Sequence, residues 1–314
     1  MHLSERLGRR IKLQDLHILM TVVQSGSMGK AAASLNTSQP NISKSIADLE
    51  HTLGVRLLDR HRQGVEPTEY GRALLDGGST VFDELRQTLK NIEFLADPEA
   101  GEVRVGSIAP IASSFVSSVV DRITRRHPRM VLNLVTRDTE TLHRELRERN
   151  VDLLIARKFT SIAEDKVNFE SLFEDSYAVV AGMKNPWARR RRIKLSDLMN
   201  ESWVLQPPES PPGAIAREAF RASGLDYPHA TVIANPADVR MHLLATGRFL
   251  TIFSSSTMRF HAGYPELKIL PVELPTARVQ IGIITLKGRT LSPVARVFIE
   301  YAREVAKDLA SRRP

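Results

Sequence analysis

Residues 26–45 read GSMGKAAASLNTSQPNISKS, and this stretch decides the fold of the first third of the chain. Glycines precede a lysine, as in a phosphate-binding loop, but that loop needs four residues between its glycines and a Ser or Thr after the lysine. Here only Ser27 and Met28 lie between the glycines, and Ala31 follows Lys30. The spacing therefore argues against a nucleotide-binding loop.

The same stretch is typical of two short helices joined by a turn. Ser27 can cap one helix, and Asn36 can end it. Thr37 or Ser38 can cap the next helix, with Pro40 in the first turn, where a missing N–H costs nothing. The alanines between them allow close packing at a steep angle, which predicts a helix-turn-helix.

The face of the second helix that turns away from the core is small and polar. Gln39, Ser43 and Ala47 form one row, and Pro40 and Lys44 form the next. Gln39 and Ser43 can bond base edges, Pro40 can contact a thymine methyl group, and Lys44 can pair with phosphate or guanine. The alternative is a solvated face of a small helical domain that binds no nucleic acid.

A basic hairpin follows, in the sequence LLDRHRQGVEPTEYG at residues 57–71. We expect it to turn at Gln63 and Gly64. Arg60 and Arg62 beside the turn can reach backbone phosphates or the minor groove, as a wing next to a recognition helix does.

A long helix is predicted from its cap at Thr68 to about Ala96. Two interpretations stay open: a two-stranded coiled coil between copies, or a helix packed on its own domain. Adjacent glycines at 77 and 78 either let two helices approach closely or mark a bend. The predicted seam consists of Leu74, Gly78, Val81, Leu85, Thr88, Ile92 and Leu95.

After an acidic linker at residues 96–102, short apolar runs alternate with helical stretches, which predicts a parallel sheet covered by helices. Ligands of such sheets bind outside the carboxyl ends of the strands. Arg157 ends the third run and offers a fixed charge there, although it can equally pair with Asp165. Helices after the first two strands would aim N–H groups at an anion.

Composition limits the remaining classes. The 314 residues contain no cysteine, which excludes disulfides and thiolate chemistry, and the formal net charge of +8 suits an anionic partner. We find no apolar run of membrane-spanning or secretory length, and expect a cytoplasmic protein without membrane contact. Neither a catalytic constellation nor metal-ligand histidine spacing is present, so we expect no enzyme, metal or cofactor.

The N-terminal third resembles the DNA-binding domain of LysR-type transcriptional regulators. The resemblance is carried by the AA-x-x-L turn, SQP-x-I-S, I-x-x-LE-x-x-LG and the L-L-x-R-to-PT wing, which stand here in order. It implies an all-α winged helix-turn-helix domain (1–67), a linker and dimerisation helix (68–97) and an effector-binding domain (98–314). The implied DNA-binding residues are Ser38, Gln39, Pro40, Ser43 and Lys44, with Arg60 and Arg62 in the wing.

The C-terminal two thirds resemble the effector domain of the same family, an α/β domain of two lobes similar to type 2 periplasmic binding proteins. Lobe 1 is expected at about 102–176 and 277–314, and lobe 2 at about 177–276. The residues expected near the effector, including Arg157 from the strand-end argument, are Ser107, Pro110, Thr136, Arg157, Gln206 and Asp238.

We therefore expect a ligand-responsive transcription regulator. The expected partners are promoter DNA, a small-molecule effector, a second or further copies of the chain as a homodimer or homotetramer, and RNA polymerase. Similarity to the branch that regulates sugar-binding-protein and aromatic-acid genes suggests a sugar or a small carboxylate as effector. The alternatives are a solute-binding protein, or an enzyme domain fused to a DNA-binding module.

Overall fold

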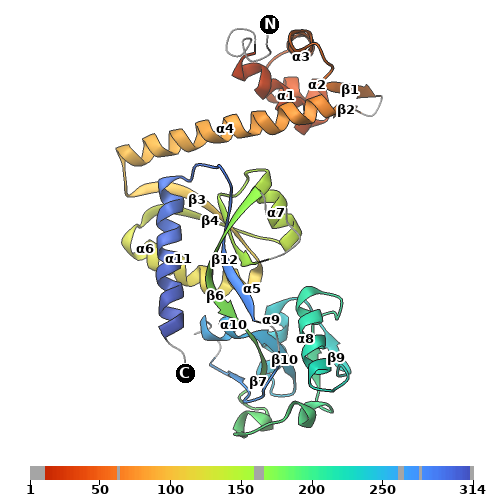
Figure 1. The fold of residues 1–314 in the computed structure, drawn as a ribbon, viewed down its shortest axis with the longest axis vertical. Helices are drawn as coiled ribbons and strands as arrows, with labels where there is room; N and C mark the ends of the chain where they lie inside the picture. Colours follow the sequence, from red (N-terminus) through yellow and green to blue (C-terminus); the bar gives the residue numbers. More distant parts are fainter. Residues whose placement is uncertain (1–10, 62–63, 159–165, 261–264, 276–277, 312–314) are drawn as a thin grey trace. The chain divides into compact units, whose positions relative to one another are not determined.

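The computed structural model describes residues 11–61, 64–158, 166–260, 265–275 and 278–311. The chain forms two compact units, Met1–Leu89 and Lys90–Pro314 (Figure 1). The boundary falls inside the long helix α4 (Glu69–Ala96). Within the described ranges, no helix is both long and apolar enough to cross a membrane.

The N-terminal unit is a three-helix core with a two-stranded hairpin. Its turns form where the sequence indicated: Gly26 ends the first helix in the left-handed region at φ 67°, and the Ser27 and Ser38 hydroxyls cap the next two helices. Asn36 takes a positive φ of 49° between them. The elements are α1 (Leu13–Ser25), α2 (Met28–Ser34), α3 (Gln39–Leu53), β1 (Leu58–His61) and β2 (Gly64–Pro67).

The apolar residues of helix α4 form two groups, one packed against the N-terminal unit and one exposed. Leu74 packs against the core of the N-terminal unit, and a Cβ at Gly78 would lie 3.7 Å from Met20 Sδ of α1. The glycine therefore serves contact with α1 of its own chain, which corrects the predicted seam at its first two positions. The large aliphatic residues of α4 that stay exposed are Val81, Leu85, Leu89, Ile92 and Leu95.

The C-terminal unit contains two five-stranded sheets. The first has the order β4-β3-β5-β12-β6, in which the first three strands are parallel and the last two antiparallel. The parallel arrangement expected for the first three strands is confirmed, and β12, which returns from the second lobe, adds an antiparallel neighbour to β5. The strands are β3 (Ala100–Ser107), β4 (Arg129–Thr136), β5 (Leu153–Arg157), β6 (Val167–Asp175) and β12 (Val279–Leu286).

Helices cover both faces of this first sheet. One face packs against α6 (Ser117–Arg126) and α11 (Pro293–Ser311), and the other against α7 (Thr139–Arg147). The helical segment after β3 is divided into α5 (Ala109–Ile111), the π-helix η2 (Ala112–Val116) and α6. At this break the Ser117 hydroxyl donates to the carbonyl of Ala112 at 2.8 Å, a bond that competes with the backbone ladder.

The second sheet has the order β11-β7-β10-β8-β9. Phe220 of α8 packs edge-on against Trp203 on one face of it, and Met241 and Leu244 of α9 cover the other. The elements of this lobe are β7 (Tyr177–Gly182), η4 (Pro186–Arg189), η5 (Leu195–Leu198), β8 (Trp203–Leu205), α8 (Pro211–Ala222), β9 (Ala230–Ile233), α9 (Ala237–Ala245), β10 (Leu250–Ser254), α10 (Ser255–Phe260) and β11 (Leu267–Ile269).

The buried carboxylate of Asp175 holds the crossing from the first lobe to the second. It accepts hydrogen bonds from the backbone N–H groups of Ser176 and Ser256, at 3.0 and 2.9 Å, and from the Ser256 hydroxyl at 2.7 Å. The end of β6 is thereby tied to the start of α10.

Candidate functional sites

The N-terminal half of α3 presents the predicted recognition surface. Ser38, Gln39, Pro40 and Lys44 are exposed and Ser43 is half-buried, while Ile42, Ile46 and Leu49 on the opposite face belong to the core. Gln39 lies beside α2, since a Cβ at Gly29 would come within 3.4 Å of its Oε1 atom. The helix therefore offers an amide, a hydroxyl and an ammonium group on one accessible side.

The hairpin is fixed to this helical core by its backbone. The amide of Val65 donates to the carbonyl of Gly26 at 3.0 Å, and a Cβ at Gly64, which has a φ of 146°, would clash with that oxygen. Arg60 pairs with Val65 in the antiparallel ladder and is exposed. Arg62 and Gln63 lie outside the described residues, so of the two predicted wing arginines the structure places Arg60.

Glu50 of α3 joins the recognition helix to the hairpin. Its Oε1 atom accepts hydrogen bonds from the backbone amides of Leu57 and Leu58, at 2.7 and 3.2 Å. This carboxylate supplies the physical role of the glutamate in the LE-x-x-LG run, which pattern reading alone did not assign.

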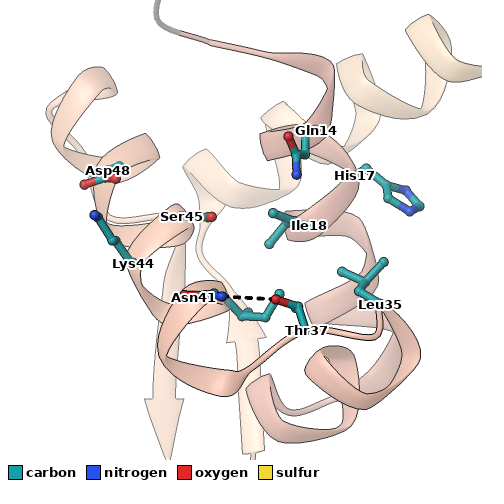
Figure 2. Close-up of a pocket in the computed structure, with 10 residues that line it drawn as sticks. Gln14, His17, Ile18, Leu35, Thr37, Asn41, Lys44, Ser45 and Asp48 are labelled. Carbon is teal, nitrogen blue, oxygen red and sulfur yellow. Dashed lines mark hydrogen bonds between the residues drawn. The ribbon is translucent and has the colours of Figure 1, made fainter.

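A pocket of about 430 Å³ lies between α1 and α3. Figure 2 shows Gln14 and His17 on the α1 side and Lys44 and Asp48 on the α3 side. Lys44 lines this pocket, whereas Gln39 and Ser43 do not. The ammonium group therefore lies to one side of the row formed by Gln39 and Ser43, where it suits a phosphate better than a base edge.

The second candidate site is a cleft of about 520 Å³ in the C-terminal unit. Its walls follow the carboxyl ends of β3, β4, β5, β8, β9 and β10, where ligands of open α/β sheets bind. Apolar groups dominate, among them Pro211, Pro236 and Phe253. The cleft thus has the mixture of apolar wall and few polar groups typical of small-molecule sites.

Two arginines line the cleft although they are almost fully buried, with Arg157 7% and Arg240 3% exposed. The Nε atoms of both lack a hydrogen-bond partner. Arg240 stacks over the ring of Phe253 at 4.3 Å and donates through Nη1 to the carbonyl of Ile252. Burial lowers the pKa of Arg240 to about 10, which still leaves it charged at neutral pH.

Tyr177 lies beside Arg157, whose guanidinium carbon is 5.3 Å from the phenol ring centre. The Tyr177 hydroxyl is buried without a hydrogen-bond partner. Burial raises the pKa of Tyr177, Arg157 and Arg240 act to lower it, and the Asp175 carboxylate acts to raise it, so all three charged groups lie near the phenol.

The structure brings half of the six expected effector residues to the cleft: Pro110, Arg157 and Gln206 line it. Ser107, Thr136 and Asp238 do not line it themselves, although each is next in the chain to a residue that does. The Ser107 hydroxyl is buried and donates to the carbonyl of Ile155 at 2.7 Å, and Asp238 lines a separate pocket beside His242. Thr136 is exposed at the end of β4.

Sequence reasoning missed Arg240, Tyr177 and the hydroxyls of Ser254 and Thr257, which also line the cleft. Arg240 sits on α9, whose polar and apolar residues show no clear periodicity in the sequence. The signal that could have found it is its place in a helix two residues after Asp238. That spacing puts the two side chains about 200° apart around the helix axis, so when Asp238 faces away from the cleft, Arg240 faces it.

Acidic and histidine side chains show no grouping suited to a metal ion in the part of the chain that the structure describes. The exposed run Arg189–Arg192 lies on lobe 2 and lines neither of the two candidate sites.

Two family models match the chain side by side. The model described as bacterial regulatory helix-turn-helix protein, lysR family, matches residues 13–72, and the model of the LysR substrate binding domain matches residues 96–307. Among curated proteins, the HTH-type transcriptional regulator GbpR of Azospirillum brasilense is 27% identical and covers 98% of this chain and 90% of its own length.

Solved structures with the same fold include a full-length OxyR variant from Pseudomonas aeruginosa, with a TM-score of 0.67 and 22% identity, covering 95% of this chain and 97% of that one. Full-length CbnR complexed with its target DNA has a TM-score of 0.55 at 20% identity, covering 94% of this chain and 100% of that one. At these identities the structures establish the fold.

Proposed function

The chain belongs to the LysR family of bacterial transcriptional regulators, and from that premise we propose that it reads promoter DNA with α3 while a small molecule bound in the cleft of its C-terminal unit controls it. Membership of this family means that the chain is a DNA-binding regulator with an effector-binding domain. A free-standing solute-binding protein or a fused enzyme is not favoured, because the helix-turn-helix and substrate-domain matches lie side by side along the chain.

Base recognition is assigned to Gln39 and Ser43, and phosphate contact to Lys44 and Arg60. The observation that carries this assignment is the exposed polar face of α3 opposite its buried Ile42 and Ile46. Base-edge contacts carry sequence preference, and lysine contacts with phosphate carry affinity that falls as salt rises.

Fluorescence anisotropy with DNA from upstream of its own gene tests the assignment. We expect wild type to prefer this DNA to a scrambled duplex by roughly a thousandfold. The double variant Gln39→Ala, Ser43→Ala should lose that preference with an unchanged salt slope. Lys44→Gln should keep the preference and reduce the slope of log K against log salt by about one.

Arg191→Gln is the matched control, since it removes one exposed positive charge on lobe 2. It should change neither the preference nor the slope. Equal binding of wild type to both duplexes at every salt concentration would refute the regulator proposal.

We propose that two copies pair through α4. The supporting observation is the exposed row of Val81, Leu85, Leu89, Ile92 and Leu95, whose steps of three and four residues suit a two-stranded seam. A dimer doubles the number of bases that one recognition helix can read.

We also propose that the DNA-bound regulator contacts RNA polymerase. In vitro transcription from the bound promoter would test that contact.

A further inference from the structure

The buried arginines of the cleft carry cationic charge that the described protein does not neutralise. Neither Arg157 nor Arg240 forms an ion pair with a described carboxylate, although both are more than nine-tenths buried. Burying an ionised group without a partner is costly, so such groups persist where a ligand completes them.

The described acids near these arginines are either engaged elsewhere or exposed, and Asp165, considered above as a partner of Arg157, lies outside the described residues. Asp175 accepts three hydrogen bonds at the lobe crossing. Asp138, at the cleft rim, is exposed and caps α7 by accepting from the amide and hydroxyl of Thr141, at 2.9 and 2.7 Å. Glu140 is exposed on the same rim. None of these carboxylates neutralises the interior pair.

At the two buried arginines and the neighbouring tyrosine, three hydrogen-bond donors have no acceptor: Arg157 Nε, Arg240 Nε and the Tyr177 hydroxyl. A neutral sugar would bring hydroxyls that accept hydrogen bonds but leave both charges unbalanced. A carboxylate or a phosphate group supplies acceptor oxygens and negative charge together, in the geometry that guanidinium groups bind best.

The rest of the wall limits the body of the ligand. Ile108, Pro110, Pro211, Pro212 and Phe253 line the cleft near the ends of the strands and helices. Their side chains offer apolar contact, and the three prolines also lack a backbone N–H donor. A cleft of about 520 Å³ has room for a compact organic molecule.

We infer that the effector is a small organic anion whose carboxylate or phosphate group is held by Arg157, Tyr177 and Arg240, with a compact apolar body against the proline-rich wall. The inference rests on the proposed effector role of the cleft. Of the two effector classes that the sequence suggests, a sugar or a small carboxylate, it favours the charged one.

The test uses the full-length protein and thermal unfolding followed by tryptophan fluorescence, because both tryptophans lie in the C-terminal unit. The probes are benzoate, phenyl phosphate, benzamide and galactose at constant ionic strength. We expect one or both anions to raise Tm saturably, whereas benzamide and galactose do not. The stronger of the two anions identifies a carboxylate or a phosphate site.

Arg157→Met and Arg240→Met should weaken the apparent affinity for that anion roughly ten- to a hundredfold. Their Tm without ligand should equal or exceed that of wild type, because an unpaired buried charge is removed. A purely structural role predicts a lower Tm instead. Arg240→Lys keeps the charge without the planar fork and should fold but bind weakly. Arg191→Met is the exposed control and should match wild type.

Three results would overturn the inference: stabilisation by benzamide or galactose equal to that by the anions, an unchanged anion response in both Met variants, or no response of wild type to either anion. Fluorescence anisotropy with promoter DNA on the same preparations distinguishes failure of this inference from failure of the proposed function. Intact DNA preference with no anion response removes only the inference, whereas lost DNA preference removes the proposed function.

Discussion

Single carboxylates hold together parts of this protein that are distant in the sequence. Glu50 binds two amides at the start of the hairpin, Asp152 joins α4 to the first sheet, and Asp175 secures the lobe crossing. In each case a charged acceptor satisfies backbone N–H groups that are at least partly buried, and removing it leaves those donors without a partner.

Glu50→Ala should destabilise the N-terminal unit by about 2 to 4 kcal/mol, because two part-buried amides lose their acceptor. Glu50→Gln keeps an oxygen acceptor without the charge, and should cost about 1 kcal/mol. Urea unfolding followed by far-UV circular dichroism measures the change. Exposed Glu66→Gln on β2 is the control, and an effect of Glu50→Ala no larger than this control would contradict the assigned role.

His143 of α7 predicts a dependence of stability on pH. Its ring nitrogens are buried without hydrogen-bond partners, and burial, helped by Arg147, lowers its pKa below the ordinary value of about 6.5. As pH falls through about 6.5, the unfolded chain therefore binds a proton that the folded chain does not. Stability is full above that pH and decreases below it.

His143→Leu should remove this loss when urea unfolding at pH 7.5 and 5.5 is compared. His242→Leu, at an exposed position of α9, should leave the loss in place. If the pH dependence persists unchanged in His143→Leu, this histidine is not its source.

At the scale of elements, an ion pair ties the last turns of α4 to β5 within the C-terminal unit. Lys90, near the end of α4, pairs with Asp152, which stands just before β5. The other end of that strand is Arg157, in the cleft. One strand thus runs from the linker helix to the candidate effector site.

Asp152→Asn should destabilise the C-terminal unit by about 3 kcal/mol, since Asp152 binds Lys90 and the buried Arg289 as well as the amide of Arg104. Tryptophan fluorescence during urea unfolding measures it. Asp121→Asn, which breaks an exposed pair with Arg125, should change stability by less than about 1 kcal/mol. Equal effects of both variants would refute the buried role.

The exposed seam of α4 gives a second prediction at this scale. Leu85→Glu with Ile92→Glu should convert a dimer into monomers, because like charges would face each other across the pair of helices. Sedimentation velocity measures the mass. Thr80→Glu adds charge at an exposed position outside the seam and should leave the mass unchanged. Dimers of unchanged stability in the double variant would place the interface elsewhere.

At the scale of the whole molecule, regulation requires that cleft and DNA occupancy influence each other. If an anion changes the affinity for promoter DNA by some factor, DNA must change the affinity for the anion by the same factor. We expect a factor of roughly 5 to 150, typical of allosteric coupling. Titrating the stabilising anion with and without saturating promoter DNA measures it, and a scrambled duplex is the control. A factor of one would mean that the cleft does not regulate DNA binding.

The sequence by itself determined the helix-turn-helix, the caps at Ser27 and Thr68, and a choice between Thr37 and Ser38 for the cap of α3, which is Ser38 in the structure. These features depend on local rules, such as a hydroxyl before a helix or a glycine after it, which neighbouring residues satisfy together. The strands β6 and β11 were not anticipated. Both are edge strands; β6 mixes polar with apolar residues and β11 has only three residues, so neither gives a strong apolar pattern.

Only the tertiary structure decided which polar residues meet in the cleft. Asp238 and Arg240 are two residues apart, yet a helix turns them about 200° from each other, so the arginine enters the cleft and the aspartate lines another pocket. Arg157 and Tyr177 come from different strands and meet because two sheets bring their ends together. A binding site of this kind depends on contacts between distant segments, which local spacing does not encode.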